Sequence, residues 1–442
     1  MTKHNRPSAT NRGLDRRVLL RQGSAVAGTA AVFSAINAAF PGGAFAQGSG
    51  PEVKGTRLGY IALTDAAPLV IAKEKGLFTK HGLPDMDIAK QASWGATRDN
   101  MALGVKANGI DGGHILRPKA HLYATGKVMQ NGQPLPMYTL LNLNEDCQAI
   151  SVSNEFKDLK IGLDSSPLKA AFEKKKAAGK DVKVAMTFPG GTHDLWIRYW
   201  LAAGGIDPDK DISTITVPPP QMVANMKVGT MDAFCVGEPC NEQLVNQEIG
   251  FTAATTGELW FKHPEKVLGM RADFVDANPK ATRAILMAVM EAQQWCEKQE
   301  NKAEMAEIIG RRQWFNVPVP DILGRIKGDI NYGNGRTAKG TNLLMKFWGQ
   351  KGEVSYPWKS LDTWFVTENI RWGKFDPSID IKVLVDKTNR SDLWIEAAKE
   401  LGLANAPSGD SRGPEKFFDG KIFDPANPQA YLASLAIKRA AV

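Results

Sequence analysis

The chain has 442 residues, of which 43% are hydrophobic and 23% charged, and its formal net charge is +8. These values are typical of a globular protein, and they exclude a collagen-like, low-complexity or wholly disordered chain. The positive excess suggests a nucleic acid or a membrane surface as partner, unless the basic residues are concentrated in a removable segment.

The first 46 residues have the features of an export signal. Arg16 and Arg17 precede two leucines, a weakly apolar stretch covers 24–40, and Ala44-Phe45-Ala46 offers a small-x-small cleavage site. The paired arginines indicate the twin-arginine route. A basic tail before an anchoring helix is the alternative, but the stretch is short and rich in Gly and Ala. No cysteine lies near the cleavage site, so we expect no lipid anchor.

Removal of residues 1–46 changes the charge argument. The segment contains six Lys or Arg and one Asp, so the mature chain carries a charge of about +3. No long basic run remains for a nucleic acid, and no later stretch has the apolar length of a membrane-spanning helix. We therefore expect an exported periplasmic protein that binds no nucleic acid.

From Thr56 onward, short apolar runs alternate with amphipathic stretches, which predicts an α/β fold with a mostly parallel sheet covered on both faces. The predicted strands cover 57–61, 86–89, 183–186, 211–217 and 232–236. The predicted helices cover 69–75, 98–103, 192–203, 222–228, a segment from Pro239, 281–297 and 302–311. Asp65 is interpreted as the N-cap of the first helix and Gly76 as its end.

The C-terminal third has a different character. Five tryptophans are spread through irregular sequence, and we expect them to pack in the core and between lobes; they are Trp314, Trp348, Trp358, Trp364 and Trp372. The tail after Asn405 is rich in Gly, Pro and Asp and is expected to wrap over the surface.

The four cysteines, Cys147, Cys235, Cys240 and Cys296, match no zinc-binding spacing. An oxidising compartment permits a disulfide between Cys235 and Cys240, but buried free thiols are the default expectation.

A recurring strand–loop–helix start is the main chemical signal. It occurs at 63–65, 190–193 and 236–239, and 93–97 could form a fourth. Helix N-termini offer unpaired N–H groups, and convergence of several such turns would make a small-anion site. Phosphate-loop, nucleophile-elbow, zinc-protease and dinucleotide motifs are absent. Taken alone, His193 could be a local hydrogen-bonding residue and Lys266 a solvated charge.

Several segments together resemble the nitrate- and bicarbonate-binding proteins of ABC importers. The resemblance extends from about Gly55 to Leu435, and the segments that carry it are 59–72, 93–100, 187–196, 236–239, 256–260, 263–266 and 416–428. It implies a two-lobed, clamshell periplasmic-binding-protein fold with an extended C-terminal segment. The implied division is 55–150 and 260–442 for lobe I and 151–259 for lobe II.

The resemblance also implies the ligand and its contacts. Trp94 would offer its indole N–H, Gln148 its amide, Gly237 its backbone N–H and His193 its imidazole, while Lys266 would supply the countercharge. Bicarbonate-binding members are understood to carry an acidic residue and to use calcium at the position of Lys266, so nitrate or nitrite is favoured here. No cofactor and no enzyme activity are expected, and the implied partners are an ABC permease and its ATP-binding subunits.

Two departures and three alternatives accompany this prediction. The signal lacks a lipid-accepting cysteine, and the segment 114–121 is more basic than expected for the family. A bicarbonate receptor of the same family and a nitrate sensor for a regulatory partner are the alternatives within the fold. An enzyme would need His193 to work with Asp194 or Glu238, but no nucleophile accompanies them.

Overall fold

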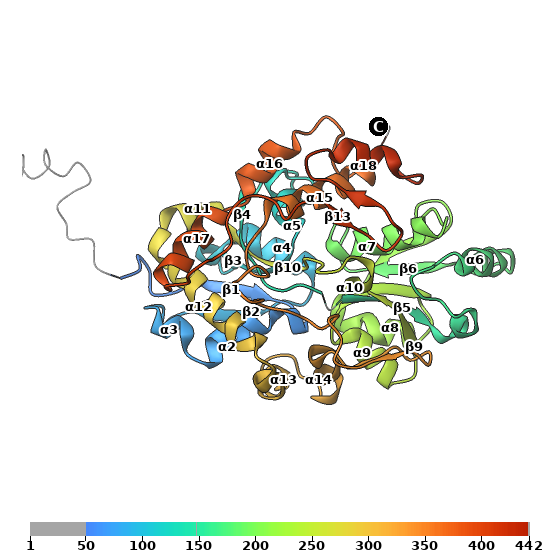
Figure 1. The fold of residues 1–442 in the computed structure, drawn as a ribbon, viewed down its shortest axis with the longest axis horizontal. Helices are drawn as coiled ribbons and strands as arrows, with labels where there is room; N and C mark the ends of the chain where they lie inside the picture. Colours follow the sequence, from blue (N-terminus) through green and yellow to red (C-terminus); the bar gives the residue numbers. More distant parts are fainter. Residues whose placement is uncertain (1–49, 147, 441–442) are drawn as a thin grey trace, which may run out of the picture. The chain divides into compact units, whose positions relative to one another are not determined.

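The computed structural model describes residues 50–146 and 148–440. The predicted export signal and Cys147 lie outside the described residues. The chain from Gly50 onward forms one compact unit built on two five-stranded sheets (Figure 1).

The first sheet has the strand order β2-β1-β3-β10-β4. Its strands are β1 (Arg57–Tyr60), β2 (Asp87–Lys90), β3 (Gly112–Leu116), β4 (Met137–Asn142) and β10 (Lys266–Arg271). Strands β1, β2 and β3 are parallel, and β10 runs antiparallel to both β3 and β4. β10, which arrives from a distant part of the sequence, therefore lies between β3 and β4 and pairs with both along its length.

The second sheet repeats this plan with the order β7-β6-β8-β5-β9. Its strands are β5 (Gln148–Ser153), β6 (Lys183–Met186), β7 (Ser213–Thr216), β8 (Ala233–Gly237) and β9 (Gly250–Thr255). Strands β6, β7 and β8 are parallel, whereas β5 is antiparallel to β8 and β9. The mostly parallel arrangement expected from the sequence is confirmed in strand direction, because a single strand of each sheet, β10 or β5, runs opposite to the other four.

The chain crosses between the sheets twice, from β4 to β5 and from β9 to β10. The two crossings pair with each other: the Asp146 amide donates to the His263 carbonyl at 2.8 Å, and the His263 amide donates to the Asp146 carboxylate at 2.9 Å. These paired segments define the two-lobed architecture, with one lobe around each sheet.

Helices follow most strands. In the first half they are α2 (Ala67–Glu74), α3 (Leu77–Lys80), α4 (Trp94–Leu103), α5 (Lys119–Ala124), α6 (Pro167–Ala177), α7 (Thr192–Ala203), α8 (Met222–Lys227), α9 (Cys240–Asn246) and α10 (Thr256–Leu259). In the second half they are α11 (Ala272–Ala277), α12 (Pro279–Glu297), α13 (Lys302–Gly310), α14 (Pro320–Lys327), α15 (Lys359–Arg371), α16 (Ile381–Thr388), α17 (Ser391–Glu400) and α18 (Pro428–Ser434). No described helix is long and apolar enough to cross a membrane.

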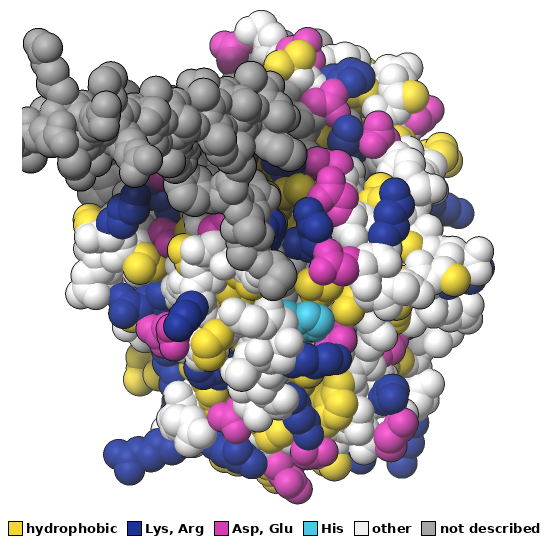
Figure 2. Space-filling model, turned by 90° about the vertical axis from the view of Figure 1, so that its left-hand side faces the viewer, with side chains coloured by type: hydrophobic (Ala, Val, Ile, Leu, Met, Phe, Trp, Pro, Cys, Tyr) yellow, Lys and Arg dark blue, Asp and Glu magenta, His cyan; other side chains and the backbone are white. Residues whose placement is uncertain are grey.

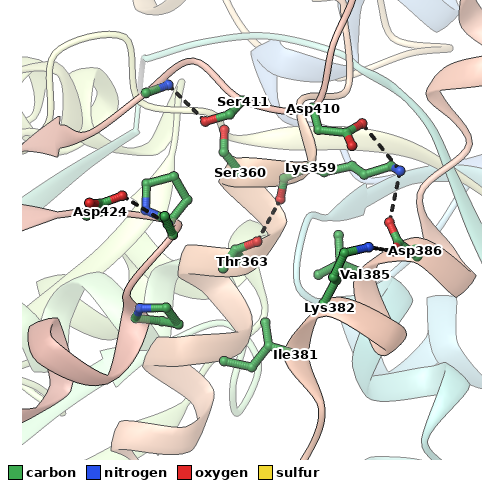
Figure 3. A pocket seen from close by; sticks show the side chains of 14 residues that line it. Lys359, Ser360, Thr363, Ile381, Lys382, Val385, Asp386, Asp410, Ser411 and Asp424 are labelled. Carbon is green, nitrogen blue, oxygen red and sulfur yellow. Dashed lines mark hydrogen bonds and ion pairs between the residues drawn. The ribbon is translucent and has the colours of Figure 1, made fainter.

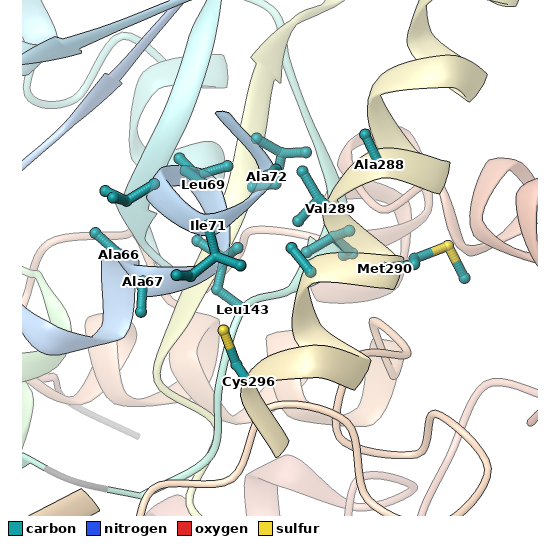
Figure 4. Packing of buried hydrophobic residues seen from close by; sticks show 14 of the residues in the cluster. Ala66, Ala67, Leu69, Ile71, Ala72, Leu143, Ala288, Val289, Met290 and Cys296 are labelled. Atoms are coloured by element: carbon teal, nitrogen blue, oxygen red, sulfur yellow. The ribbon is translucent and has the colours of Figure 1, made fainter. Parts of the chain in front are cut away.

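The largest apolar core lies between α2 and α12 (Figure 4). Ile71 of α2 and Val289 of α12 are fully buried in it. Alanines at 67, 72 and 288 let the two helices approach closely, and apolar residues recur every three to four positions along α12. Pro68 fits the first turn of α2, because an N–H group at that position of a helix would have no acceptor within the helix.

The C-terminal segment adds short pairs, β11 (Ile330–Asn331) with β12 (Thr337–Ala338) and β13 (Glu415–Lys416) with β14 (Ile422–Phe423). The tail after Asn405 is more than a surface wrap, because Phe417, Phe423 and Tyr431 are buried in an aromatic cluster. Trp364 of α15 stacks on Trp196 of α7 with ring centroids 5.1 Å apart. Of the five predicted tryptophans, Trp314, Trp348, Trp364 and Trp372 are buried, and Trp358 is half-buried against two core clusters.

Two local predictions need correction. Asp65 is not the cap of α2: it lies in a 3₁₀ turn (Thr64–Ala66), and the position before α2 is Ala66, which has no side-chain oxygen to accept a capping bond. The helix predicted from Arg98 begins at Trp94, because the Ser93 hydroxyl caps it by accepting from the Ala96 amide at 3.0 Å. Cys235 and Cys240 are buried free thiols.

Candidate functional site

The five predicted site residues lie where strands end and helices begin, and all four side chains among them are fully buried. Trp94 opens α4 and His193 lies in the first turn of α7. Lys266 and Gln148 are the first residues of β10 and β5, and Gly237 is the last of β8. The fold therefore gathers residues that are far apart in the sequence at the facing ends of the two sheets.

Contacts link these residues into one region. Gln148 and Gly237 are directly paired on neighbouring antiparallel strands. The Lys266 Nζ atom lies 3.5 Å from His193 Nε2 and 5.8 Å from the centroid of the Trp94 ring. Lys266 and Trp94 come from the first lobe, whereas His193, Gln148 and Gly237 lie in elements of the second sheet or helices that follow it.

The absence of a side chain at Gly237 lets the two lobes approach each other closely. A Cβ atom there would lie 3.1 Å from the Asp65 Oδ2 atom and 3.4 Å from Leu63. Both neighbours belong to the opposite lobe, so a side chain at 237 would press the two lobes apart.

Two buried carboxylates surround Lys266, and the sequence prediction missed both. The ammonium donates to Asp65 Oδ2 at 2.9 Å and also to Glu265. The other oxygen of Asp65 lies 2.6 Å from His114 Nε2. All four side chains are fully buried, so the lysine does not present an unbalanced positive charge.

The network sets the protonation of its members. Burial opposes ionisation of Asp65, but Lys266 and His114 outweigh it and hold the pKa of Asp65 below its usual value. Burial raises the pKa of Glu265 well above its usual range, with Asp65 adding to the effect and Lys266 opposing it. Burial opposes the charge of Lys266, yet Asp65 and Glu265 raise the pKa of Lys266 overall. Burial and the Lys266 charge lower the pKa of His193 well below its usual value.

Several polar atoms in this region are fully buried without a hydrogen-bond partner in the protein. They are the Trp94 indole N–H, both amide atoms of Gln148, the hydroxyls of Thr64 and Thr192, and Glu265 Oε1. An unpartnered buried donor or acceptor costs about 1–3 kcal/mol, so their accumulation around one point indicates a place for a polar ligand. Thr64 and Thr192, which the sequence prediction did not select, are neighbours of Asp65 and His193.

The lobes also touch directly around the site. The Thr64 amide donates to the Glu238 carbonyl at 2.7 Å across the two lobes. An apolar cluster, which we call the interlobe cluster, draws on both sides; it includes Ile61, Leu63, Trp94 and Leu116 from the first lobe and Ala185, Phe188, Val217 and Val236 from the second. The site is thus enclosed by apolar contacts between the lobes.

The most prominent pocket lies elsewhere. It has a volume of about 520 Å³ and is lined by α15, α16 and the C-terminal tail (Figure 3). Its lysine, Lys359, is paired with Asp386 at 2.9 Å and Asp410 at 3.3 Å. These charges satisfy one another, and none of the predicted site residues lines the pocket.

The charged side chains on one face of the molecule are mixed in sign. On the face shown in Figure 2, Lys and Arg side chains are interspersed with Asp and Glu. Within residues 50–146 and 148–440, no group of three or more His, Cys, Asp or Glu side chains is placed to hold a metal ion. The electrostatics that matter are therefore those of the buried network.

Two mixed sheets, two paired crossings and a polar site between the lobes define a solute-binding protein of the two-lobed periplasmic type. The crystal structure of the periplasmic nitrate-binding protein NrtA from Synechocystis PCC 6803 superposes with a TM-score of 0.85 and 58% identity, covering 88% of this chain and all of that one. Residues 49–310 match the NMT1-like family, and the chain belongs to this family.

Curated relatives come from cyanobacteria. The nitrate/nitrite binding protein NrtA from Synechocystis is 59% identical over 391 residues, covering 88% of this chain and 86% of the relative. The bicarbonate-binding protein CmpA from Synechococcus elongatus is 47% identical over 399 residues, covering 88% of each. The chain thus belongs to the group of binding proteins that the sequence motifs resemble.

Proposed function

We propose that this protein is the solute-binding component of an ABC importer and that it binds nitrate, or nitrite, between its two lobes. The observation that carries the proposal is the convergence of unpartnered buried donors, the Trp94 indole N–H and the Gln148 amide, beside Lys266 and His193. The 59% identity to a nitrate/nitrite binding protein supports the same ligand.

The chemistry of nitrate fits this set of groups. Nitrate is a planar monoanion with three equivalent acceptor oxygens, so its transfer from water requires several donors and a positive environment. Indole, amide and backbone N–H groups donate without accepting in return, or can turn their donor end toward the ligand. We assign the ligand contacts to Trp94, Gln148, His193, Gly237 and Lys266.

Nitrate is favoured over bicarbonate by the charge at position 266. A protonated lysine has no lone pair with which to coordinate the divalent cation of a calcium-assisted bicarbonate site, and the Lys266 ammonium already occupies the Asp65 and Glu265 carboxylates. The bicarbonate-binding relative, at 47% identity, stands further from this chain than the nitrate-binding one.

We further propose that the protein acts in the periplasm, after export through the segment 1–46, and delivers its ligand to a membrane permease driven by ATP-binding subunits. The predicted boundary at 150/151 falls inside β5 (Gln148–Ser153), a strand of the second sheet, so lobe II would comprise 148–259 and lobe I would comprise 55–146 and 260–442. Ligand binding would shift an open–closed equilibrium, since only the closed form contacts the anion from both lobes. This role needs no catalysis and no cofactor, and a sensor role would need a regulatory partner instead of a permease.

Calorimetric titration of the protein, purified from the periplasmic fraction of an expressing cell, tests the proposal. We expect heat of binding with nitrate or nitrite and none with bicarbonate in the presence of calcium. Recovery of the protein only from the cytoplasm would contradict export. Binding of bicarbonate with calcium, and not of nitrate, would transfer the assignment to the bicarbonate group.

The matched variants are Lys266→Glu and Lys262→Glu, which make the same charge change at a buried and at an exposed lysine four residues apart. We expect Lys266→Glu to abolish nitrate binding and Lys262→Glu to leave it intact. Circular dichroism checks that both variants fold. Retention of nitrate affinity in folded Lys266→Glu would remove Lys266 from the site.

A further inference from the structure

A second buried lysine lies beside the candidate site, and the proposed ligand set does not include it. Lys119 opens α5, its side chain is fully buried, and its ammonium donates to the Trp94 backbone carbonyl at 2.8 Å. Among residues 50–146 and 148–440, no carboxylate oxygen lies within 4.0 Å of the Lys119 ammonium. An ammonium that is buried without a counterion is rare, because the loss of hydration is not repaid by a charge of opposite sign.

Aromatic rings take the place of a counterion. The Lys119 ammonium lies 4.0 Å from the centroid of the Phe188 ring, 4.8 Å from that of Trp94 and 5.4 Å from that of Tyr123. Each distance falls within the range of a cation–π interaction. Phe188 belongs to the turn after β6 in the second lobe, whereas the other two rings belong to the first lobe. The ring cage around Lys119 is therefore completed across the lobes.

The two lysines near Trp94, Lys266 and Lys119, differ in whether a carboxylate compensates their positive charge. Lys266 contacts the carboxylates of Asp65 and Glu265, so its positive charge is already compensated inside the protein. Lys119 contacts a neutral carbonyl and the faces of three rings. An anion that accepts from the Trp94 indole would therefore find its uncompensated positive charge in Lys119, and not in Lys266.

We propose that Lys119 is the second cation of the anion site and supplies the net positive charge that a bound monoanion requires. The inference rests on the proposed nitrate-binding function and adds an affinity-determining residue to it. The ligand class remains a small monoanion. The Lys119 ammonium, which contacts Trp94, attracts this anion electrostatically.

The protonation behaviour of this lysine sets a condition on such a role, because Lys119 supplies a positive charge only in its protonated form. Burial lowers the pKa of Lys119 well below its usual range, with Arg98 adding to the effect and Asp99 opposing it. The remaining charged or titratable groups nearby are His114, Tyr123 and Lys266. An anion bound beside the ammonium has the reverse effect and favours the protonated form. Affinity should therefore decline as pH rises through the pKa of Lys119.

The experiment compares nitrate affinity and thermal stability in full-length wild type, Lys119→Met, Lys119→Gln and the exposed control Lys127→Met. Lys119→Gln keeps a donor for the Trp94 carbonyl but removes the charge, which separates an electrostatic role from a merely structural one. We expect both Lys119 variants to weaken nitrate binding about tenfold or more, as loss of one charged partner does. The control should bind as wild type does.

The melting temperature without nitrate provides the second measurement. Lys119→Met removes the cost of burying a charge without a counterion but also removes one hydrogen bond to the Trp94 carbonyl, so it should lose affinity with little change in stability. A titration over pH should show a shallower loss of affinity in Lys119→Gln than in wild type.

The outcomes distinguish a failure of the proposal for Lys119 from a failure of the proposed nitrate-binding function. Wild-type affinity retained in Lys119→Gln would overturn the proposal and leave Lys119 as a hydrogen-bond donor only. Parallel loss of stability and affinity in Lys119→Met, with Lys119→Gln unaffected, would overturn it as well. Absence of nitrate and nitrite binding in the wild type would instead overturn the proposed function itself.

Discussion

The Lys266 ammonium and the Asp65 carboxylate form a fully buried ion pair of 2.9 Å between residues that are 201 positions apart in the sequence. The pair joins the turn after β1 to the start of β10, at the face where the two lobes meet. Removing either partner leaves the other buried with only its second contact, Glu265 for Lys266 or His114 for Asp65, which is more destabilising than loss of the pair as a whole.

Asp65→Asn should therefore lower stability but increase the response to ligand. Loss of the carboxylate leaves Lys266 less compensated, at a cost of about 3–5 kcal/mol in free energy of unfolding. A bound anion restores part of this balance, so nitrate should raise the melting temperature more in Asp65→Asn than in wild type. Differential scanning fluorimetry with and without nitrate measures both effects. An equal or smaller nitrate-induced shift in the variant would contradict the charge-balance argument.

Glu265→Gln should make nitrate affinity less dependent on pH. In the folded protein burial raises the pKa of Glu265, and a bound anion nearby favours its neutral form further. The wild type should bind best below this pKa and lose affinity as pH rises through it, because the anion must then share the site with a second negative charge. Glutamine keeps the size of the side chain without the charge. Calorimetric titration at several pH values distinguishes the two profiles, and identical profiles would exclude Glu265 from the linkage.

Trp94→Phe and Gln148→Met should weaken binding without destabilising the fold. Each change removes a buried polar group that has no protein partner, so the free protein loses no hydrogen bond. A hydrogen bond to a charged ligand contributes about 1.5–3 kcal/mol, which corresponds to roughly 10–100-fold in affinity. Trp295→Phe and Gln247→Met are the matched controls, since both residues lie outside the site. Unchanged nitrate affinity in Trp94→Phe would refute the indole contact.

Asp362→Asn should weaken the attachment of α15 to the turn between β3 and α5. Asp362 accepts from Arg117 Nε at 2.7 Å and from the Asn389 amide at 2.7 Å, and it lies 3.2 Å from His121 Nε2. The variant leaves the buried Arg117 without its counterion, so we expect a loss of about 3–5 kcal/mol in the free energy of unfolding at neutral pH. Asp158→Asn, at an exposed position, is the control.

The Asp362–Arg117 ion pair stabilises the fold only within a defined pH range. Although burial opposes ionisation, Arg117 and His121 lower the pKa of Asp362 to about 2. The stabilisation is complete above the unfolded-state pKa of about 3.9 and is lost as pH falls toward the folded-state value. Urea denaturation should therefore show the difference between wild type and Asp362→Asn narrowing below pH 4. A constant difference down to pH 2 would rule out this linkage.

The periodic pattern of the sequence predicted β1, β2, β6, β7 and β8, whose alternation with helices depends on local burial, but it missed β3, β4 and β9. It was insufficient for β10 and β5, whose antiparallel pairing is decided by partners far away in the chain. The role of Asp65 likewise could not be predicted from the local sequence. Its position before a helix is typical of an N-cap, yet a lysine and a histidine reached only through the tertiary fold bind its two oxygens.

The candidate site was predicted in part for a physical reason. Trp94, His193 and Gly237 lie at strand ends and helix starts, which local sequence signals mark. Asp65, His114 and Glu265 could not be selected, since a carboxylate or imidazole next to an apolar run is usually a solvated group or a cap. Two signals were available: the adjacent Glu265-Lys266 pair in an apolar context, and the unusual basic content of 114–121, which contains both His114 and Lys119.

The interlobe cluster has a thermodynamic consequence. Side chains such as Leu63 and Val236 are fully buried in the cluster where the two lobes touch. Apolar surface removed from water lowers heat capacity by about 0.45 cal/K/mol for each Å². If closure accompanies binding, the heat capacity change measured with nitrate will be far more negative than an inorganic ion alone can produce. The temperature dependence of the binding enthalpy would then report on the hinge motion, even though the ligand itself has no hydrophobic surface.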